Sequence, residues 1–121
     1  MTQAFTHEVL SGSTNGLGVK VAASATLGTT VHTAIAGTTS RDEVWLWVQN
    51  QNASGATRTL TIEFGGATSP DNLITVPIPA KAGPVLVIPG LPLRKGLAVT
   101  AFADVANECI VYGYVNRVTV S

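Results

Sequence analysis

Residues 43–64, which read EVWLWVQNQNASGATRTLTIEF, decide the fold class of this 121-residue chain. In their second half, Leu60, Ile62 and Phe64 alternate with Thr59, Thr61 and Glu63. An alternation of period two predicts a β-strand with one face in the core and one face in water. The polar stretch between the two halves contains Gly55 and is typical of a hairpin connection at the surface.

The first half of the same stretch is apolar on both of its faces. Val44, Leu46 and Val48 occupy one face, and Trp45 and Trp47 both project from the other. A strand of this kind needs a core on one side and a second apolar contact on the other. The tryptophan pair is therefore the feature of this hairpin that calls for a functional explanation.

Outward from this hairpin, the chain reads as short β-branched segments separated by Gly, Pro, Asn and Asp, without the apolar spacing of an amphipathic helix. The expected strands cover residues 17–26, 30–35, 43–50, 57–64, 73–78, 85–88, 97–102 and 109–118. About eight short strands predict an all-β fold, an antiparallel β-sandwich of the jelly-roll type. We expect residues 17–121 to form this single domain and the polar, turn-rich residues 1–16 to form an extended N-terminal arm.

Two later segments indicate where their strands lie within the sheets. Residues 77–96, PIPAKAGPVLVIPGLPLRKG, hold five of the six prolines. Proline cannot donate to a sheet ladder, so edge strands and tight corners are expected there. The last expected strand, CIVYGYVNRV at 109–118, places Ile110, Tyr112 and Tyr114 on one face and further apolar residues on the other. It should be a central strand or an interface strand.

Composition limits the partners. Charged residues make up only 12% of the chain, the formal net charge is zero and the mean hydropathy is +0.33, which favours association with other proteins. A chain without a basic field is a poor partner for nucleic acid or for a membrane surface. The lone Cys109 excludes an internal disulfide, and neither a signal peptide nor a membrane-spanning run is recognisable. We expect synthesis in the cytosol.

No catalytic or metal-binding pattern emerges from the sequence. His7 and His32 lie 25 residues apart without neighbouring ligand residues, so neither a metal nor any other cofactor is expected. The acidic residues sit mostly in turn-like contexts, where Asp42 and Asp71 are expected to bond their local backbone. A hydrolase remains the least favoured class, and loss of turnover on mutating Glu63 or Asp104 would reveal one. We expect no enzymatic activity.

Two further features have simple interpretations. Asn52-Ala53-Ser54 matches a glycosylation acceptor, but a surface loop explains it without a secretory route. Trp45 and Trp47 are expected in the core or in a subunit interface. Sugar binding is the first alternative, and base stacking is a remote one because basic neighbours are lacking.

Two stretches resemble small β-sandwich proteins of tailed bacteriophages, which include head-decoration, neck and tail accessory components. Residues 30–66, TVHTAIAGTTSRDEVWLWVQNQNASGATRTLTIEFGG, resemble their opening hairpin. Residues 77–118, PIPAKAGPVLVIPGLPLRKGLAVTAFADVANECIVYGYVNRV, resemble their closing half. The resemblance spans about three quarters of the chain, from about residue 29 to residue 118.

The resemblance implies a virion protein without enzymatic activity, present in many copies. The leading expectation is a capsid decoration or cement protein, made in the host cytoplasm, that forms a homo-oligomer, favoured as a trimer, and binds the major capsid protein or another virion protein. The arm, residues 1–16, would then face the capsid. The alternatives are a neck, tail or fibre component and a carbohydrate-binding module that uses Trp45 and Trp47. The expected interface residues are Trp45, Trp47, Tyr112, Tyr114 and Phe5.

Overall fold

The structure is a computed structural model that describes residues 2–121. This part of the chain forms strands β1 (Gln3–Val9), β2 (Val19–Lys20), β3 (Thr29–Thr33), β4 (Arg41–Asn50), β5 (Arg58–Phe64), β6 (Leu73–Ile78), β7 (Val85–Leu93), β8 (Ala98–Ala103) and β9 (Cys109–Val120). Every pairing between these strands is antiparallel. The expected all-β antiparallel sandwich is confirmed, and within residues 2–121 no helix could span a membrane.

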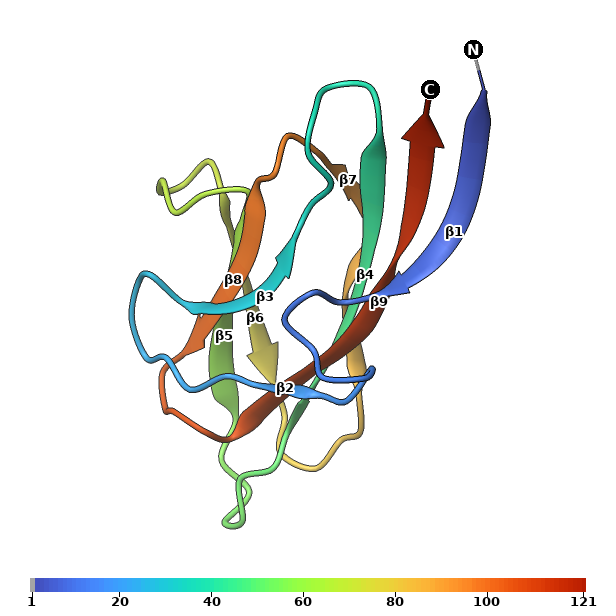
Figure 1. Cartoon of the computed structure of the whole chain (residues 1–121). Helices are drawn as coiled ribbons and strands as arrows, with labels where there is room; N and C mark the ends of the chain where they lie inside the picture. The colour runs from blue at the N-terminus through green and yellow to red at the C-terminus, as the bar shows by residue number, and fades with distance from the viewer. Residues whose placement is uncertain (1) are drawn as a thin grey trace.

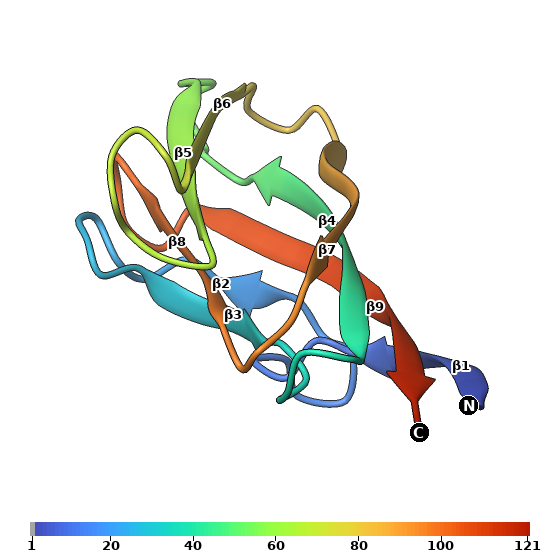
Figure 2. The ribbon, with the colours of Figure 1, turned by 90° about the horizontal axis from the view of Figure 1, so that it is seen from above.

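The strands form two layers that face each other (Figure 1 and Figure 2). One sheet has the order β1-β9-β4-β7, with β2 beside β9, and the other has the order β3-β8-β5-β6. The pairs are nested along the chain, because β1 pairs with β9, β3 with β8, β4 with β7 and β5 with β6. Apart from the short β2, the chain is a long hairpin rolled into two sheets, which is the topology of a jelly roll.

The core lies between the two sheets. From β4 it takes the side chains of Val44, Leu46 and Val48, and from β5 those of Leu60 and Ile62, all almost completely buried. These are the residues that the two alternating patterns assign to inner faces. The alternation in β4 is complete, since every second residue from position 42 to position 50 is buried and those between are half-exposed.

The proline-rich segment supplies edge strands as expected. β7 is one edge of its sheet and contains Pro89 and Pro92, and β6 is an edge of the other sheet and contains Pro77. β9 lies in the interior of its sheet, between β4 on one side and β1 with β2 on the other. Of the two positions expected for the last strand, central or interface, the central position is therefore confirmed.

The N-terminal segment differs from the expectation of a loose arm. Residues 3–9 form β1, which pairs with β9 from Gln3 opposite Val120 to Val9 opposite Tyr114. All seven residues of β1 are exposed, so the segment has no alternation that would reveal a strand. Residues 17–26 differ in the opposite direction: a strand is expected over the whole segment, but only Val19 and Lys20 form one. Met1, included in the expected arm, lies outside the described residues.

Candidate functional site

The outer face of the larger sheet gathers aromatic residues from two strands far apart in the sequence. β4 and β9 are neighbours, and their register sets Trp45 opposite Tyr114 and Trp47 opposite Tyr112. Directly opposite residues share a face of the sheet, and here that face points away from the core. We call these four side chains the aromatic face. The structure therefore brings together four of the five interface residues expected from the sequence.

Three rings of the aromatic face, those of Trp45, Trp47 and Tyr114, lie in nearly parallel planes. The centroids of Trp45 and Trp47 are 6.2 Å apart, and Tyr114 lies 6.5 Å from Trp45 and 6.1 Å from Trp47. The interplanar angles are between 13° and 23°. Each ring is half-buried, so its remaining surface is available to a partner. Tyr112 is held at the margin by a hydrogen bond that its hydroxyl accepts from the side-chain amide of Gln49.

Two glycines make room for these rings. A Cβ placed on Gly90 of β7 would lie 2.9 Å from the Trp45 indole, and one on Gly18 would lie 2.8 Å from the Tyr112 ring. The missing side chains let the two rings pack closely against the backbone at Gly90 and Gly18. Gly90 also adopts a φ of 78°, a conformation that residues with a side chain rarely adopt.

β1 extends the same face to the edge of the molecule. His7 stacks on Tyr114 at 5.4 Å, and Val9 lies directly opposite Tyr114 in the register. Phe5, the fifth expected interface residue, shares the face with His7 and Val9 but lies at the margin, with 70% of its surface exposed. The structure thus places Phe5 on the extension of the aromatic face.

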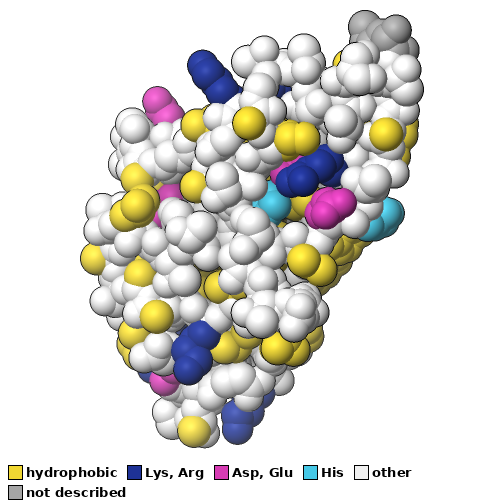
Figure 3. Space-filling model, in the orientation of Figure 1, with side chains coloured by type: hydrophobic (Ala, Val, Ile, Leu, Met, Phe, Trp, Pro, Cys, Tyr) yellow, Lys and Arg dark blue, Asp and Glu magenta, His cyan; other side chains and the backbone are white. Residues whose placement is uncertain are grey.

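Charge is sparse on the molecular surface. Figure 3 shows one side of the molecule, on which charged side chains are few, several of them gathered at the upper right, and apolar side chains reach the surface at many points. Phe5, Val9 and Leu86 are among the most exposed large apolar residues of the described chain, and all three lie on the outer face of the larger sheet. Such an exposed apolar surface is typical of a protein-binding site.

A buried ionic network, which the sequence does not reveal, connects β3, β4 and β9. Asp42 is fully buried, and its carboxylate accepts hydrogen bonds from Arg117 at 2.8 and 3.0 Å and from the Ile35 amide at 3.1 Å. His32 Nδ1 accepts the Ser11 amide proton at 3.0 Å, so Nε2 carries the ring proton and donates it to Asp42 at 2.8 Å.

This arrangement corrects the prediction of a turn role for Asp42. Burial alone would raise the pKa of Asp42, but the hydrogen bonds of Arg117 and His32 and the charge of Arg117 outweigh burial and hold the pKa below its usual value. The network joins β3, β4 and β9 and leaves no free acid or base. Its role is structural.

Glu63 occupies a second buried polar site. The sequence predicts a wet face for Glu63 and Thr61, and this prediction is wrong because both side chains are buried. The Glu63 carboxylate accepts hydrogen bonds from the Thr100 hydroxyl at 2.5 Å, the Gly28 amide at 2.7 Å and the Thr26 hydroxyl. Burial alone would raise the pKa of Glu63, but these hydrogen bonds outweigh burial and hold the pKa below its usual value. The carboxylate ties the segment before β3 to β5.

Asp104, the other acid considered for a hydrolase, does not meet Glu63. Its carboxylate accepts the Thr59 amide proton at 3.1 Å, at the opposite end of β5 from Glu63. The two acids therefore cannot act on one bond.

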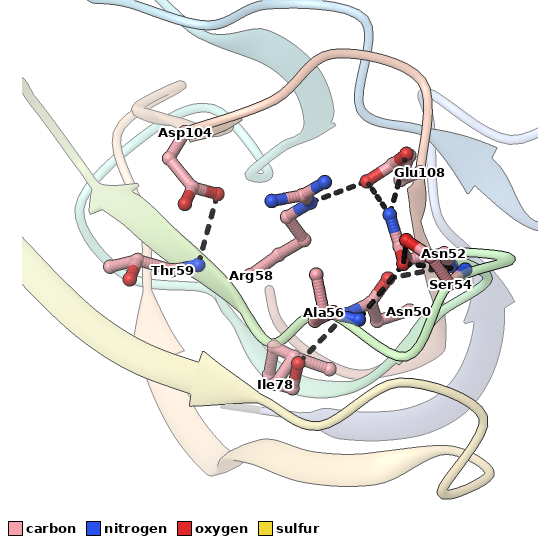
Figure 4. Close-up of polar contacts among 9 residues, drawn as sticks. All are labelled: Asn50, Asn52, Ser54, Ala56, Arg58, Thr59, Ile78, Asp104 and Glu108. Atoms are coloured by element: carbon pink, nitrogen blue, oxygen red, sulfur yellow. Dashed lines mark hydrogen bonds and ion pairs between the residues drawn. The ribbon is translucent and has the colours of Figure 1, made fainter.

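The side chain of Asn52 organises the loop between β4 and β5 (Figure 4). The side-chain oxygen of Asn52 accepts the Ser54 amide proton at 3.0 Å and the Ala56 amide proton at 2.9 Å, while its amide nitrogen donates to Glu108 at 3.0 and 3.2 Å. Arg58 points toward Glu108 and donates to it, and this hydrogen bond lowers the pKa of Glu108. Asn52 is thus a buried loop organiser, and its amide is already occupied.

Other kinds of site are not evident among residues 2–121. No group of three or more His, Cys, Asp or Glu side chains is placed to hold a metal ion, and no pocket is present there. Cys109 is buried, and burial raises the pKa of its thiol, which keeps it protonated and unreactive. Within this part of the chain, the aromatic face is the strongest candidate for a functional site.

Comparison of the chain with protein-family models, with curated proteins and with solved structures found no match.

Proposed function

We propose that this chain is a non-enzymatic structural protein of a bacteriophage particle, a capsid decoration or cement protein that binds the head as a symmetric oligomer. The observation that carries the proposal is the aromatic face, which is half-exposed, poor in charge and carried on a rigid sheet. Tryptophan and tyrosine contribute the most to protein–protein binding, because they bury a large area at a low entropic cost. The partner would be the major capsid protein or another virion protein.

The fold supports this proposal at a coarser level. Jelly rolls are common among viral capsid domains and lectin domains, although a fold alone does not determine a function. A decoration protein needs no chemistry. Its contribution to head stability would come from apolar surface removed from water, at roughly 25 cal/mol per Å².

Co-sedimentation with phage heads tests the proposal. Heads of the encoding phage, assembled with this gene deleted, should bind the purified chain, and Trp47→Lys should weaken binding at least about tenfold, because it buries a charge in an apolar contact. Leu27→Lys is the matched control, since Leu27 is an equally apolar residue that lies on a loop and is 70% exposed. It should bind as the native chain does.

The outcomes separate the possible roles. Binding to tails or necks but not to heads would favour the neck, tail or fibre role. A chain that binds no virion part would contradict the proposal. A charge at Trp47 that changes binding no more than a charge at Leu27 would exclude the aromatic face as the contact.

Carbohydrate binding is the second candidate, and the near-parallel planes of Trp45, Trp47 and Tyr114 favour it. Stacked or coplanar rings on an open sheet can support the apolar faces of sugar rings. Retention of the chain on insoluble chitin or cellulose, lost in a Trp45→Ala variant, would support this role. In an assembled particle, by contrast, the tryptophan fluorescence should shift to the blue as Trp45 and Trp47 become buried.

A further inference from the structure

The edges of the two sheets are not equally protected. Natural sheet proteins block edge strands with prolines, bulges or charges, because an open edge can pair with another chain. β7 carries Pro89 and Pro92 together with two shifts in its register, β6 carries Pro77, and β3 has a register shift between Thr30 and His32.

β1 lacks two of these devices, prolines and bulges, and Glu8 is its only Asp, Glu, Lys or Arg. It has no proline and no lysine, and its register with β9 is regular over all seven residues. Figure 1 shows β1 at the margin of the molecule, with β9 on one side of it and open space on the other. β1 is therefore the least protected long edge in the described part of the chain.

The backbone of β1 offers a complete set of hydrogen-bonding groups on its open side. Thr2 and Ser121 exchange two backbone hydrogen bonds, at 3.2 and 2.9 Å. Because such pairs alternate in an antiparallel ladder, the even-numbered residues of β1 bond to β9. The amides and carbonyls that point to the open side belong to Gln3, Phe5, His7 and Val9.

From this pattern we infer that β1 pairs, antiparallel, with the β1 of a second copy of this chain, across a two-fold axis at Thr6. This register sets Gln3 opposite Val9 of the second copy and Phe5 opposite His7 of the second copy, so every outward-pointing group of β1 has a partner. A two-fold axis at Phe5 or at His7 would leave one end of β1 unpaired. The register is thus set by the strand itself.

The side chains are compatible with this pairing. Glu8, the only carboxylate of β1, lies opposite Ala4 of the second copy, so no like charges meet. The zero net charge of the chain also leaves no long-range repulsion between copies. Phe5, which is 70% exposed in the single chain, would lie beside His7 of the second copy and continue the aromatic face across the axis.

The inference rests on the proposed function in one respect, because a subunit of a symmetric assembly needs a contact between its copies. It also makes that contact specific. A two-fold contact gives a dimer, or an even-numbered assembly built from dimers, in place of the trimer expected from the resemblance.

Disulfide cross-linking tests the contact. Thr6 would face Thr6 of the second copy as a non-hydrogen-bonded pair, with Cα atoms about 4.5 Å apart, which a disulfide can bridge. Thr6→Cys should therefore form a covalent dimer under a mild oxidant, measured on a non-reducing gel. Ala4→Cys is the matched control, because the two copies of residue 4 would be about 14 Å apart. Cys109 is buried and present in both variants.

We expect Thr6→Cys to cross-link at least about ten times faster than Ala4→Cys. Equal rates would overturn the inference. Light scattering provides the second measurement: the native chain should have twice the 12.5 kDa mass of one copy. His7→Pro, which removes an outward amide, should lower the mass to that of one copy, whereas His7→Ala should not.

These readouts are independent of the proposed function. A native trimer in which Thr6→Cys does not cross-link would overturn the β1 contact and leave the decoration role standing. Specific cross-linking in a protein that binds no phage head would support the β1 contact and contradict the decoration role.

Discussion

Asp42 shows how one buried carboxylate can hold three strands together. Removing it in Asp42→Ala would leave Arg117 and His32 without their acceptor, and breaking a buried ion pair in this way costs about 3 kcal/mol of unfolding free energy. Urea denaturation followed by tryptophan fluorescence measures the loss. Glu43→Ala is the control, because Glu43 forms a half-exposed pair with Arg41 that is worth under about 1 kcal/mol. Equal losses in the two variants would contradict the structural role of Asp42.

Gly113 is the residue of β9 at which a methyl group has no space. A Cβ there would lie 2.0 Å from the carbonyl oxygen of Trp45 and 3.1 Å from the side chain of Leu46. Gly113→Ala should therefore displace β4 from β9 and lower the unfolding free energy by about 2 kcal/mol or more. Gly66→Ala should cost less, because its neighbour is the flexible side chain of Asn72. Thermal melting compares the two variants, and a neutral Gly113→Ala would refute the close approach of the strands.

At the scale of the element, the loop between β4 and β5 depends on the side chain of Asn52. Asn52→Ala would leave the amides of Ser54 and Ala56 without their acceptor, at a cost of about 2 kcal/mol in unfolding free energy. Ser54→Ala removes only the hydroxyl contact to Asn52 and should cost under about 0.5 kcal/mol. Urea unfolding of both variants tests this, and hydrogen exchange at Ala56 should accelerate only in Asn52→Ala. Unchanged exchange would contradict it.

The sequence predicts elements well where the two faces of a strand differ. The alternation around Val44 and Leu60 identified β4, β5 and their core faces, and the prolines identified β6 and β7 as edges. The sequence does not predict β1, because all its residues are exposed and show no alternation. Its strand conformation depends on pairing with β9, more than a hundred residues later. For residues 17–26 the sequence predicts too much strand, because a β-branched composition forms a strand only where a partner backbone is available.

The sequence predicts the separate residues of the candidate site but not that they lie together. Periodicity placed Trp45 with Trp47 on one face and Tyr112 with Tyr114 on another, but only the β4–β9 register shows that the two faces are the same surface. The Asp42–Arg117 pair spans 75 positions, and no local pattern links its members. Alternation predicts a solvent-exposed Glu63 because it cannot reveal that the segment before β3 covers this side chain.

At the scale of the whole molecule, the nested pairing of the jelly roll explains why the aromatic face and the open edge are adjacent. The first and last strands of a rolled hairpin must pair, so β1 lies at the margin of the sheet whose interior strands, β9 and β4, carry the aromatic face. A partner that binds the aromatic face therefore meets β1 as well. Contact between copies through β1 would present two aromatic faces side by side.

The whole fold should lose stability in acid, and the direction follows from three carboxylates. Asp42, Glu63 and Glu108 all have pKa values lowered by folding, so the unfolded chain binds more protons than the folded chain at acidic pH. Their contribution to stability is complete above the unfolded pKa values of about 4 and is lost as the pH falls through the lower values of the folded state. Urea midpoints measured from about pH 7 to pH 2 should therefore fall steeply below about pH 4. Asp42→Asn, which removes one of the three carboxylates, should start less stable and show a shallower decline. A midpoint that stays constant to about pH 3 would mean that these hydrogen bonds do not favour the charged carboxylates.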